Sequence, residues 1–278
     1  MSSDGQAAAG RIASIAMYRD PPVVAAATRA LWALLRERLC ASDMVDVPDA
    51  LDEAIAHDAA WLDPRLLLAQ TCSYPYAVQL RGKVRVVANP VYDHPGCAGA
   101  TSNSMVIVSR ESAAVVVGDL RGRTAVINDW RSNSGMNLLR HLIAPHAQRG
   151  RFFGQIIVSG SHVASIAQVA AGAADVAAID CVTYGNLARH DPERLRGVRV
   201  LAETVRTPSL PYITRASSTD AELVALREAL FGLIADPAAK DVRDTLGLRG
   251  FEVLPESSFD AVIGLEQEAA ACGYPSLA

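Results

Sequence analysis

Aromatic residues and cysteines are scarce in this chain, and several familiar sequence signatures are missing. Phe, Trp and Tyr make up 5% of its 278 residues. No two cysteines form a CxxC pair, which argues against a zinc site or a thioredoxin-like redox motif. We expect mostly buried free thiols, with a Cys72–Cys97 bridge as the alternative if the chain is exported. The cysteines are Cys40, Cys72, Cys97, Cys181 and Cys272.

Clusters of positive charge and long apolar runs are missing as well. The net charge of -4, the pI of about 5.9 and the lack of a Lys/Arg cluster argue against a nucleic-acid partner. No apolar run is long enough to span a bilayer. The segment Met1–Gly10 has neither the basic region nor the apolar region of a signal peptide. Two locations therefore stay open: the cytoplasm for the chain as it stands, or the periplasm if a leader has been removed.

Half of the residues are hydrophobic, and predicted strands alternate with predicted helices along the chain. This alternation favours an α/β fold with mainly parallel sheets flanked by helices. We predict two lobes, lobe 1 from residues 11–101 plus 203–278 and lobe 2 from residues 102–202. Crossovers between them are expected near 100–104 and 198–206. Strands are expected at 11–17, 44–47, 66–70, 84–88, 105–108, 124–128, 155–158, 174–179 and 198–205, and helices at 23–39, 50–58, 136–146, 163–171 and over much of the chain after 220.

Small polar residues gather where predicted elements begin or end between residues 128 and 184. Ser132–Gly135 opens one predicted helix, Ser159–His162 opens another, and Asp180 ends a predicted strand. These are the places where an α/β sheet binds a small anion. Serine hydroxyls and free backbone N–H groups donate to an oxyanion without help from Lys or Arg. The segment therefore predicts a receptor for a small oxyanion rather than a site for bond chemistry.

Each of these side chains also has an ordinary structural role open to it. Ser134 is a favoured type of helix N-cap, and Asp180 is another, for the helix that follows it. His162 has the alternative of a capping or partly buried histidine. As a ligand group, Asp180 would accept a hydrogen bond from a protonated oxyanion or pair with an ammonium group.

Aromatic and basic residues are further candidates for the cleft. Tyr18 and Tyr74 follow predicted strands, and their rings either pack on a ligand or on the lobe surface. Trp130, just before Ser132, either lines the cleft or packs at the lobe surface. Arg131 and Arg140 either flank the anion site or are solvated.

Several segments together resemble a known family. Their order and spacing are similar to those of the substrate-binding proteins of phosphate, phosphite and phosphonate ABC transporters, the phosphonate-binding branch of the type II periplasmic binding fold. The resemblance covers roughly residues 11–255. The matching pieces are Leu67–Pro75, Asp119–Arg123, Ser132–Gly135, Gly160–Ser165 and Gly172–Asp180.

The resemblance implies two lobes joined by a hinge, with a ligand held in the cleft between them. Close relatives usually carry Gly at the position of Ser73 and Tyr at that of Ser102, so both positions are expected to alter the cleft. The implied oxyanion site lies on lobe 2, and tyrosines of lobe 1 close over it. The residues of the predicted site are Tyr18, Tyr74, Ser132, Asn133, Ser134, His162 and Asp180.

Three functions stay open on this basis, and we favour the first. It is a monomeric receptor that captures a phosphate, phosphite or phosphonate for an ABC transporter permease, without a cofactor or metal. The second is a cytoplasmic enzyme on the same fold, although the chain has no nucleophile elbow, P-loop or HExxH motif. Ser161, His162 and Asp180 are poorly placed for a triad, because neighbouring residues in a helix point apart. The third is a ligand sensor that reports to a partner protein.

Overall fold

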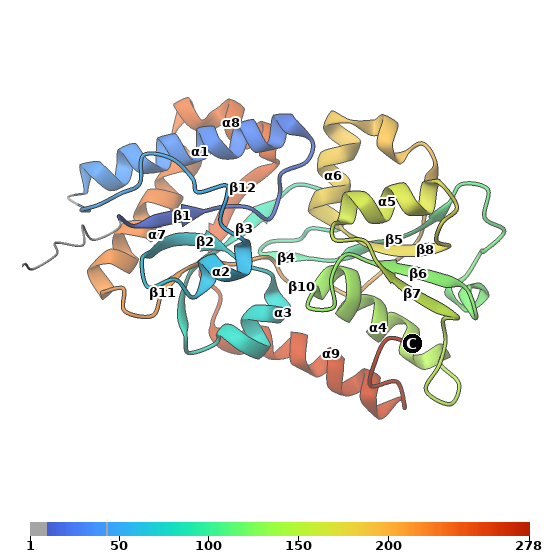
Figure 1. Ribbon diagram of the computed structural model, residues 1–278. Coiled ribbons are helices and arrows are strands. Elements are labelled where there is room, and N and C mark those ends of the chain that lie inside the picture. Colours follow the sequence, from blue (N-terminus) through green and yellow to red (C-terminus); the bar gives the residue numbers. More distant parts are fainter. Residues whose placement is uncertain (1–9, 43) are drawn as a thin grey trace, which may run out of the picture.

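The computed structural model describes residues 10–42 and 44–278 and shows two α/β lobes side by side (Figure 1). Within these residues, lobe 1 is built on a sheet of five strands in the order β1-β2-β11-β3-β12, and lobe 2 on a sheet in the order β7-β6-β8-β5-β9. None of the helices in this part of the chain is long and apolar enough to cross a membrane. Most of the segment compared with a signal peptide, Met1–Ala9, lies outside the described residues.

The strands and helices have the following bounds. The strands are β1 (Ile12–Ser14), β2 (Leu66–Gln70), β3 (Val84–Tyr92), β4 (Thr101–Ser102), β5 (Ser104–Ser109), β6 (Thr124–Ile127), β7 (Gln155–Val158), β8 (Val176–Asp180), β9 (Val198–Glu203), β10 (Thr207–Pro208), β11 (Tyr212–Arg215) and β12 (Leu248–Glu252). The α-helices are α1 (Pro22–Ala41), α2 (His57–Trp61), α3 (Ser73–Pro75), α4 (Leu138–Ile143), α5 (His162–Ala170), α6 (Cys181–His190), α7 (Asp220–Ala235), α8 (Lys240–Leu246) and α9 (Asp260–Ala271).

The two-lobed α/β class is confirmed, but the sheets are mixed rather than mainly parallel. Parallel pairs join β1 to β2, and β6 to β7 and β8. By contrast, β11 is antiparallel to β2 and β3, and β5 is antiparallel to β8 and β9. The chain enters a sheet through β5 or β11 just after crossing from the other lobe. Both strands therefore start at the edge where β8 and β2 end, and must run the opposite way.

The two crossovers lie next to each other and form a small ribbon between the lobes. β4 pairs antiparallel with β10, so that Ser102 faces Thr207. The hydroxyl of Ser73 donates to the carbonyl of Pro208 at 2.7 Å. Thr207–Pro208 is thus a short strand that joins the two crossovers. The proposed lobe boundaries near residues 101 and 202 stay a prediction.

Each sheet is covered by helices on both faces, because successive side chains of a strand point to opposite sides. In β8, Val176 and Ala178 belong to the core that includes α4, whereas Ala177 and Ile179 belong to the core with α5 and α6. In lobe 1, α1 and α7 cover one face, while α2 and the start of α9 cover the other. The layers leave the carboxyl ends of β2, β6 and β8 turned toward the opposite lobe.

Two predicted elements between residues 44 and 58 are wrong. Asp46 has a φ of 56°, which is incompatible with the predicted strand at 44–47. The carboxylate of Asp52 accepts hydrogen bonds from the N–H groups of Ala54 and Ile55, each at 3.0 Å. Such local bonding competes with a helix and explains why none forms at 50–56. The helix begins instead at His57, as α2.

The C-terminal residues join both lobes. α9 runs below them from lobe 1 toward lobe 2, and the chain ends beside lobe 2 (Figure 1). Val262 packs in a lobe 1 core, while its carbonyl accepts from the side chain of Asn137 in lobe 2 at 3.1 Å. The carbonyl of Ala278 accepts from the N–H groups of Phe152 and Phe153 at 2.8 and 3.0 Å.

Candidate functional site

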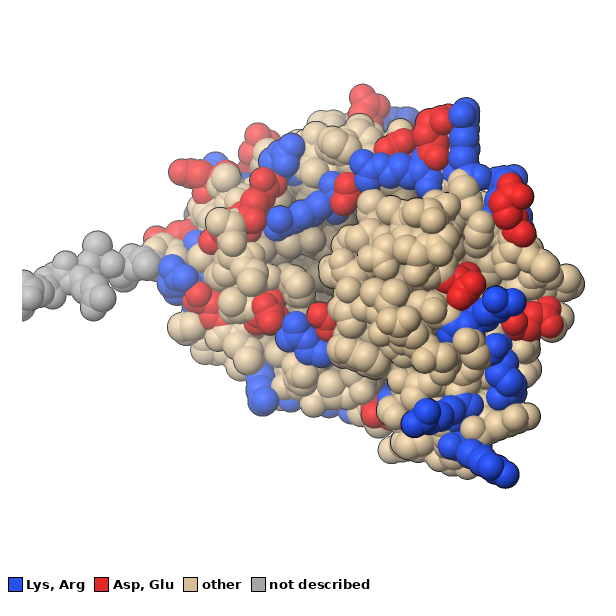
Figure 2. All heavy atoms as spheres, turned by 45° about the vertical axis from the view of Figure 1, so that its right-hand side comes forward, with Lys and Arg blue, Asp and Glu red and all other residues tan. Residues whose placement is uncertain are grey.

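A cavity of about 300 Å³ lies between the lobes, at the carboxyl ends of strands from both sheets. Lobe 1 contributes the loop after β1, α2 and the turn after β2, and lobe 2 contributes the loops after β6, β7 and β8. Figure 2 shows a hollow between the lobes, bordered by side chains of both charges. The predicted site residues that line the cavity are Tyr18, Ser132, Ser134, His162 and Asp180.

Two helix starts bring a serine and a histidine together on the lobe 2 side. The Oγ of Ser132 accepts from the N–H of Gly135 at 2.9 Å, so Ser132 is the N-cap of this turn. The N-cap role expected as an alternative for Ser134 therefore belongs to Ser132. The Oγ of Ser134 lies 2.9 Å from Nε2 of His162 and 3.5 Å from the Oγ of Ser132. Three polar groups thus converge on one wall of the cavity.

Close packing behind this wall explains why residue 135 is a glycine. A Cβ at this position would overlap Oδ1 of Asn128 and lie 3.3 Å from Cε1 of His162. Asn128 follows β6 directly and lines the cavity. Asn128 Oδ1 and His162 Nδ1 are both buried without a hydrogen-bond partner among the described protein groups. Most buried polar atoms in folded proteins have a hydrogen-bond partner, so these two atoms are candidates to bond with a ligand.

His162 is neutral in this environment at physiological pH. Burial lowers the pKa of its ring from 6.5 to about 4, and the nearby backbone of Ala178 offsets part of this effect. A neutral imidazole has one N–H to donate and one nitrogen to accept. The wall formed by Ser132, Ser134 and His162 therefore offers hydrogen-bond donors without a formal charge.

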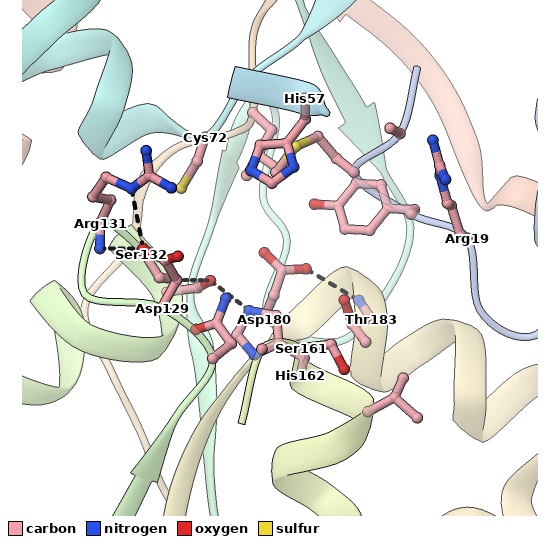
Figure 3. Close-up of a pocket in the computed structure, with 18 of the residues that line it drawn as sticks. Arg19, His57, Cys72, Asp129, Arg131, Ser132, Ser161, His162, Asp180 and Thr183 are labelled. Carbon is pink, nitrogen blue, oxygen red and sulfur yellow. Dashed lines mark hydrogen bonds and ion pairs between the residues drawn. The ribbon is translucent and has the colours of Figure 1, made fainter. Parts of the chain in front are cut away.

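Asp180 faces the same cavity from the end of β8 (Figure 3). One oxygen, Oδ1, accepts from the N–H groups of Val182 and Thr183 at 2.9 and 3.0 Å, which confirms the N-cap role. The residue is 3% exposed. Burial raises the pKa of its carboxyl from 3.8 to about 6, although these N–H groups and the hydroxyl of Tyr18 act the other way. Capping uses Oδ1 only, so Oδ2 of Asp180 is left to contact a ligand in the cavity.

The two predicted tyrosines are placed differently. Tyr18 lines the cavity, and burial, followed by the charge of Asp180, raises its pKa well above 10, so its hydroxyl keeps its proton. The hydroxyl of Tyr74 instead donates to Oε2 of Glu266 in α9 at 2.8 Å. Tyr74 packs among the hydrophobic cores and is not among the lining residues.

Asn133 also lies behind the cavity wall. Its Nδ2 donates to Oγ1 of Thr207 in the crossover strand β10 at 2.8 Å. It is 4% exposed and does not line the cavity. The structure thus places Asn133 where it connects the turn after β6 to the crossover.

Charged residues at the cavity mouth join the lobes. Nη1 of Arg131 lies 3.1 Å from Oδ2 of Asp58 in α2, and its Nε lies 3.4 Å from Oδ1 of Asp129. The hydrogen bond with the Arg131 guanidinium holds the pKa of Asp58 below its usual value. A second pair joins Arg194 to Asp20 at 3.5 Å. The sequence motifs did not indicate the Arg131–Asp58 and Arg194–Asp20 pairs, because the partners are 73 and 174 positions apart in the sequence.

Other residues expected at the cleft lie elsewhere. Trp130 is 50% exposed and does not line the cavity. Arg140 is buried; it donates to Oδ1 of Asn137 at 2.6 Å and to the carbonyl of Pro275 in the C-terminal segment at 3.0 Å. Ser102 lies in the crossover strand β4, and Ser73, at the start of α3, donates to the crossover carbonyl of Pro208; neither residue lines the cavity. His57, in contrast, lines the cavity because α2 begins at this residue (Figure 3).

The cysteines are free thiols, and the bridge considered between Cys72 and Cys97 is wrong. Cys72 lines the cavity and accepts from the N–H of Asn133 at 3.3 Å. Cys97 lies beside Cys181 instead. Among the described residues, no group of three or more His, Cys, Asp and Glu side chains is placed to hold a metal ion.

Comparisons with known proteins agree with this geometry. No curated protein matches the chain. Residues 13–259 match the family described as ABC transporter, phosphonate, periplasmic substrate-binding protein. A binding-protein component of an ABC phosphonate transporter from Pseudomonas aeruginosa has a TM-score of 0.74 and 17% identity, covering 95% of this chain and 88% of that one.

Two further solved structures share the fold. PhnD1 from Prochlorococcus marinus, in complex with methylphosphonate, has a TM-score of 0.72 and 15% identity, covering 94% of this chain and 98% of its own. A protein from Xanthomonas citri bound to ATP has a TM-score of 0.69 and 17% identity, covering 95% and 98%. The family match spans most of the chain and agrees with the two lobes and the cavity between them. The chain therefore belongs to the family of periplasmic substrate-binding proteins of phosphonate ABC transporters.

Proposed function

We propose that this substrate-binding protein captures a small phosphorus oxyanion or an organophosphonate in the interlobe cavity. The observation that carries the proposal is the convergence of Ser132, Ser134 and His162, with 2.9 Å between Oγ of Ser134 and Nε2 of His162. Hydroxyls and a ring N–H suit the three acceptor oxygens of a phosphonate. The N–H groups in the first turn of α5 lack intrahelical acceptors and add partial positive charge.

Asp180 and the size of the cavity narrow the class of ligand. A buried carboxylate repels an anion unless a proton or a cation lies between them. With a pKa raised to about 6, Asp180 is suited to accept from a protonated phosphonate or to pair with an ammonium group, as in an aminoalkylphosphonate. About 300 Å³ leaves room for an organic substituent beside the phosphorus group.

Contacts across the cleft support lobe closure as the binding motion. The ion pairs of Arg131 with Asp58 and of Arg194 with Asp20 are exposed, so each contributes at most about 1 kcal/mol. Ligand contacts with both lobes would supply the rest of the free energy that favours the closed state. We propose that the closed protein, as a monomer, delivers its ligand to a transporter permease.

No covalent step is part of this proposal. In the triad considered for Ser161, His162 and Asp180, the histidine contacts Ser134 rather than Ser161. The carboxylate of Asp180 accepts N–H groups of α6. These three side chains therefore do not form a triad.

The test is a thermal melt against phosphate, phosphite, methylphosphonate, 2-aminoethylphosphonate, sulfate and phosphate esters, followed by calorimetry on any ligand that raises the Tm. A ligand at a hundred times its Kd adds about 2.7 kcal/mol, which raises the Tm by several degrees. The double variant Ser134→Ala/His162→Ala loses two charge-assisted hydrogen bonds of about 1.5–3 kcal/mol each, so binding is expected to weaken a hundredfold or more.

Ser165→Ala is the matched control. Its hydroxyl contacts Ser159 at 2.7 Å and does not line the cavity, so binding should be retained. If the folded double variant binds like the wild type, the assigned site is wrong. If no compound in the panel raises the wild-type Tm, the assigned ligand class is wrong.

A further inference from the structure

Two cysteines touch at the first crossover, outside the cavity wall described above. The Sγ atoms of Cys97 and Cys181 are 3.4 Å apart, although 84 positions separate the residues in the sequence. Cys97 lies between β3 and β4, on the path from lobe 1 to lobe 2, whereas Cys181 begins α6 directly after Asp180. The contact therefore joins the crossover to the helix that carries the site carboxylate.

The backbone around Cys97 is shaped to allow this contact. Gly96 has a φ of +93°, and a Cβ there would overlap Oδ1 of Asn103 and lie 2.8 Å from Cβ of Cys181. The N–H of Cys97 donates to the carbonyl of His94 at 3.0 Å, which forms a tight turn. A side chain at position 96 would push Cys97 away from its partner. The proximity of the thiols thus depends on a specific turn rather than on a loose loop.

The start of the same segment is held by lobe 1. The N–H of Asp93 donates to the carbonyl of Gly247 at 2.9 Å. The Asp93 carboxylate also pairs with Arg249 of β12 and with Arg189 of α6. Since Cys97 follows only four residues later, a covalent bond at Cys97 would limit movement between lobe 1 and α6.

We propose that Cys97 and Cys181 form a reversible disulfide that ties the first crossover to α6 and restrains movement of the lobes about the hinge. The bond itself is independent of any ligand, whereas its effect on closure rests on the proposed function. Cys72, the other buried cysteine, has its sulfur near the N–H of Asn133 and serves as an internal reference.

The reaction is a thiol–disulfide exchange with a small disulfide, such as oxidised glutathione, as the oxidant. Cys97 is less buried than Cys181, so its thiolate attacks first, forms a mixed disulfide and releases one glutathione. The Cys181 thiolate then attacks the Cys97 sulfur and releases the second glutathione. The protein loses two protons and two electrons, and oxidised glutathione is reduced to two thiols. Contact with Cys97 and burial raise the pKa of Cys181, so the second step is expected to be slow.

The experiment uses the full chain with Cys40→Ser and Cys272→Ser, which removes the two exposed thiols. The protein is equilibrated in oxidised or reduced glutathione, denatured, alkylated and weighed. After oxidation only Cys72 should be alkylated, with no glutathione adduct, and dithiothreitol should restore the other two thiols. The oxidised Tm should be several degrees higher, because the bond closes a long loop in the unfolded chain. Amide exchange at residues 93–103 should become slower.

Single variants provide the controls. Cys181→Ala should show neither the higher Tm nor the slower exchange, and should leave Cys97 alkylated or carrying glutathione. Gly96→Ala should form the disulfide more slowly. The proposal is overturned if Cys97 and Cys181 both stay alkylatable after oxidation of the folded protein. It is also overturned if exchange at 93–103 is unchanged by the bond. None of these readouts uses a phosphorus ligand, so failure of the ligand panel is a separate result.

Discussion

Replacing Asp180 with Asn is expected to stabilise the ligand-free protein at neutral pH. Burial raises the pKa of this carboxyl from 3.8 to about 6, so the folded protein binds the proton more tightly than the unfolded chain. Stability from this group is therefore greatest at low pH and is lost as the pH rises from about 4 to 6. A shift of about two pKa units corresponds to about 3 kcal/mol. Asn can still cap α6, because its side-chain oxygen accepts the same N–H groups.

Unfolding of the wild type and Asp180→Asn, followed from pH 4 to 8, measures this effect. At pH 7.5 the variant should be more stable by about 1–3 kcal/mol, which raises the Tm by about 2–10 °C. The difference should shrink toward zero near pH 4. His162 acts oppositely: burial lowers its pKa from 6.5 to about 4, so its contribution is lost as the pH falls through this range. The contributions of Asp180 and His162 should therefore roughly cancel in the wild type, so the stability of the variant should rise more steeply with pH than that of the wild type.

Asp175→Asn is the matched control for this experiment. Its Oδ2 accepts from the N–H of Thr124 at 2.8 Å, and it does not line the cavity, so the substitution should not stabilise the protein. A lower Tm for Asp180→Asn at pH 7.5 would refute the reasoning, as would a stability difference that does not change with pH. The same variant also separates the two ligand roles proposed for Asp180. A larger loss of binding for 2-aminoethylphosphonate than for methylphosphonate indicates an ammonium partner, whereas equal losses indicate a protonated oxyanion.

Two further predictions concern the packing and the mouth of the site. Gly135→Ala should displace Asn128, destabilise the fold by about 1–3 kcal/mol and weaken ligand binding at least tenfold in calorimetry. Gly264 lies on α9 with open space around it, so Gly264→Ala should stabilise the fold by about 0.5–1 kcal/mol and leave ligand binding unchanged. Equal changes in stability for Gly135→Ala and Gly264→Ala would contradict the packing argument. Asp58→Asn removes the interlobe partner of Arg131 and should weaken binding by up to about fivefold at low salt. This loss should disappear at high salt, and a loss independent of salt would argue against an electrostatic contact.

Local patterns were sufficient to predict many of the elements. The expected strands at 66–70 and 155–158 coincide with β2 and β7, and the helix at 23–39 lies within α1. These segments carry their own apolar pattern and end at strong turn residues. Between 44 and 58 the pattern misled, because the backbone of Asp46 and the side chain of Asp52 oppose regular structure there.

The candidate site was predicted in part. Tyr18, Ser134 and Asp180 line the cavity because they lie in the loop after β1, in the turn after β6 and at the end of β8, where these strands end. Tyr74 and Asn133 meet the same local criteria, but their polar groups bond to α9 and β10. Which direction a side chain takes from such a position depends on neighbours that are distant in the sequence.

By itself, the sequence determined the α/β class and the helix starts that are rich in hydrogen-bond donors. It also indicated that these donors can bind an oxyanion without a lysine. These follow from interactions among residues close together in the chain, namely apolar alternation, N-capping and free backbone N–H groups. The tertiary structure decided that Ser132 rather than Ser134 is the cap, that the crossover strands run antiparallel to their neighbours, and that Cys97 meets Cys181. It also decided the raised pKa of Asp180, because burial arises only when both lobes pack around the carboxylate.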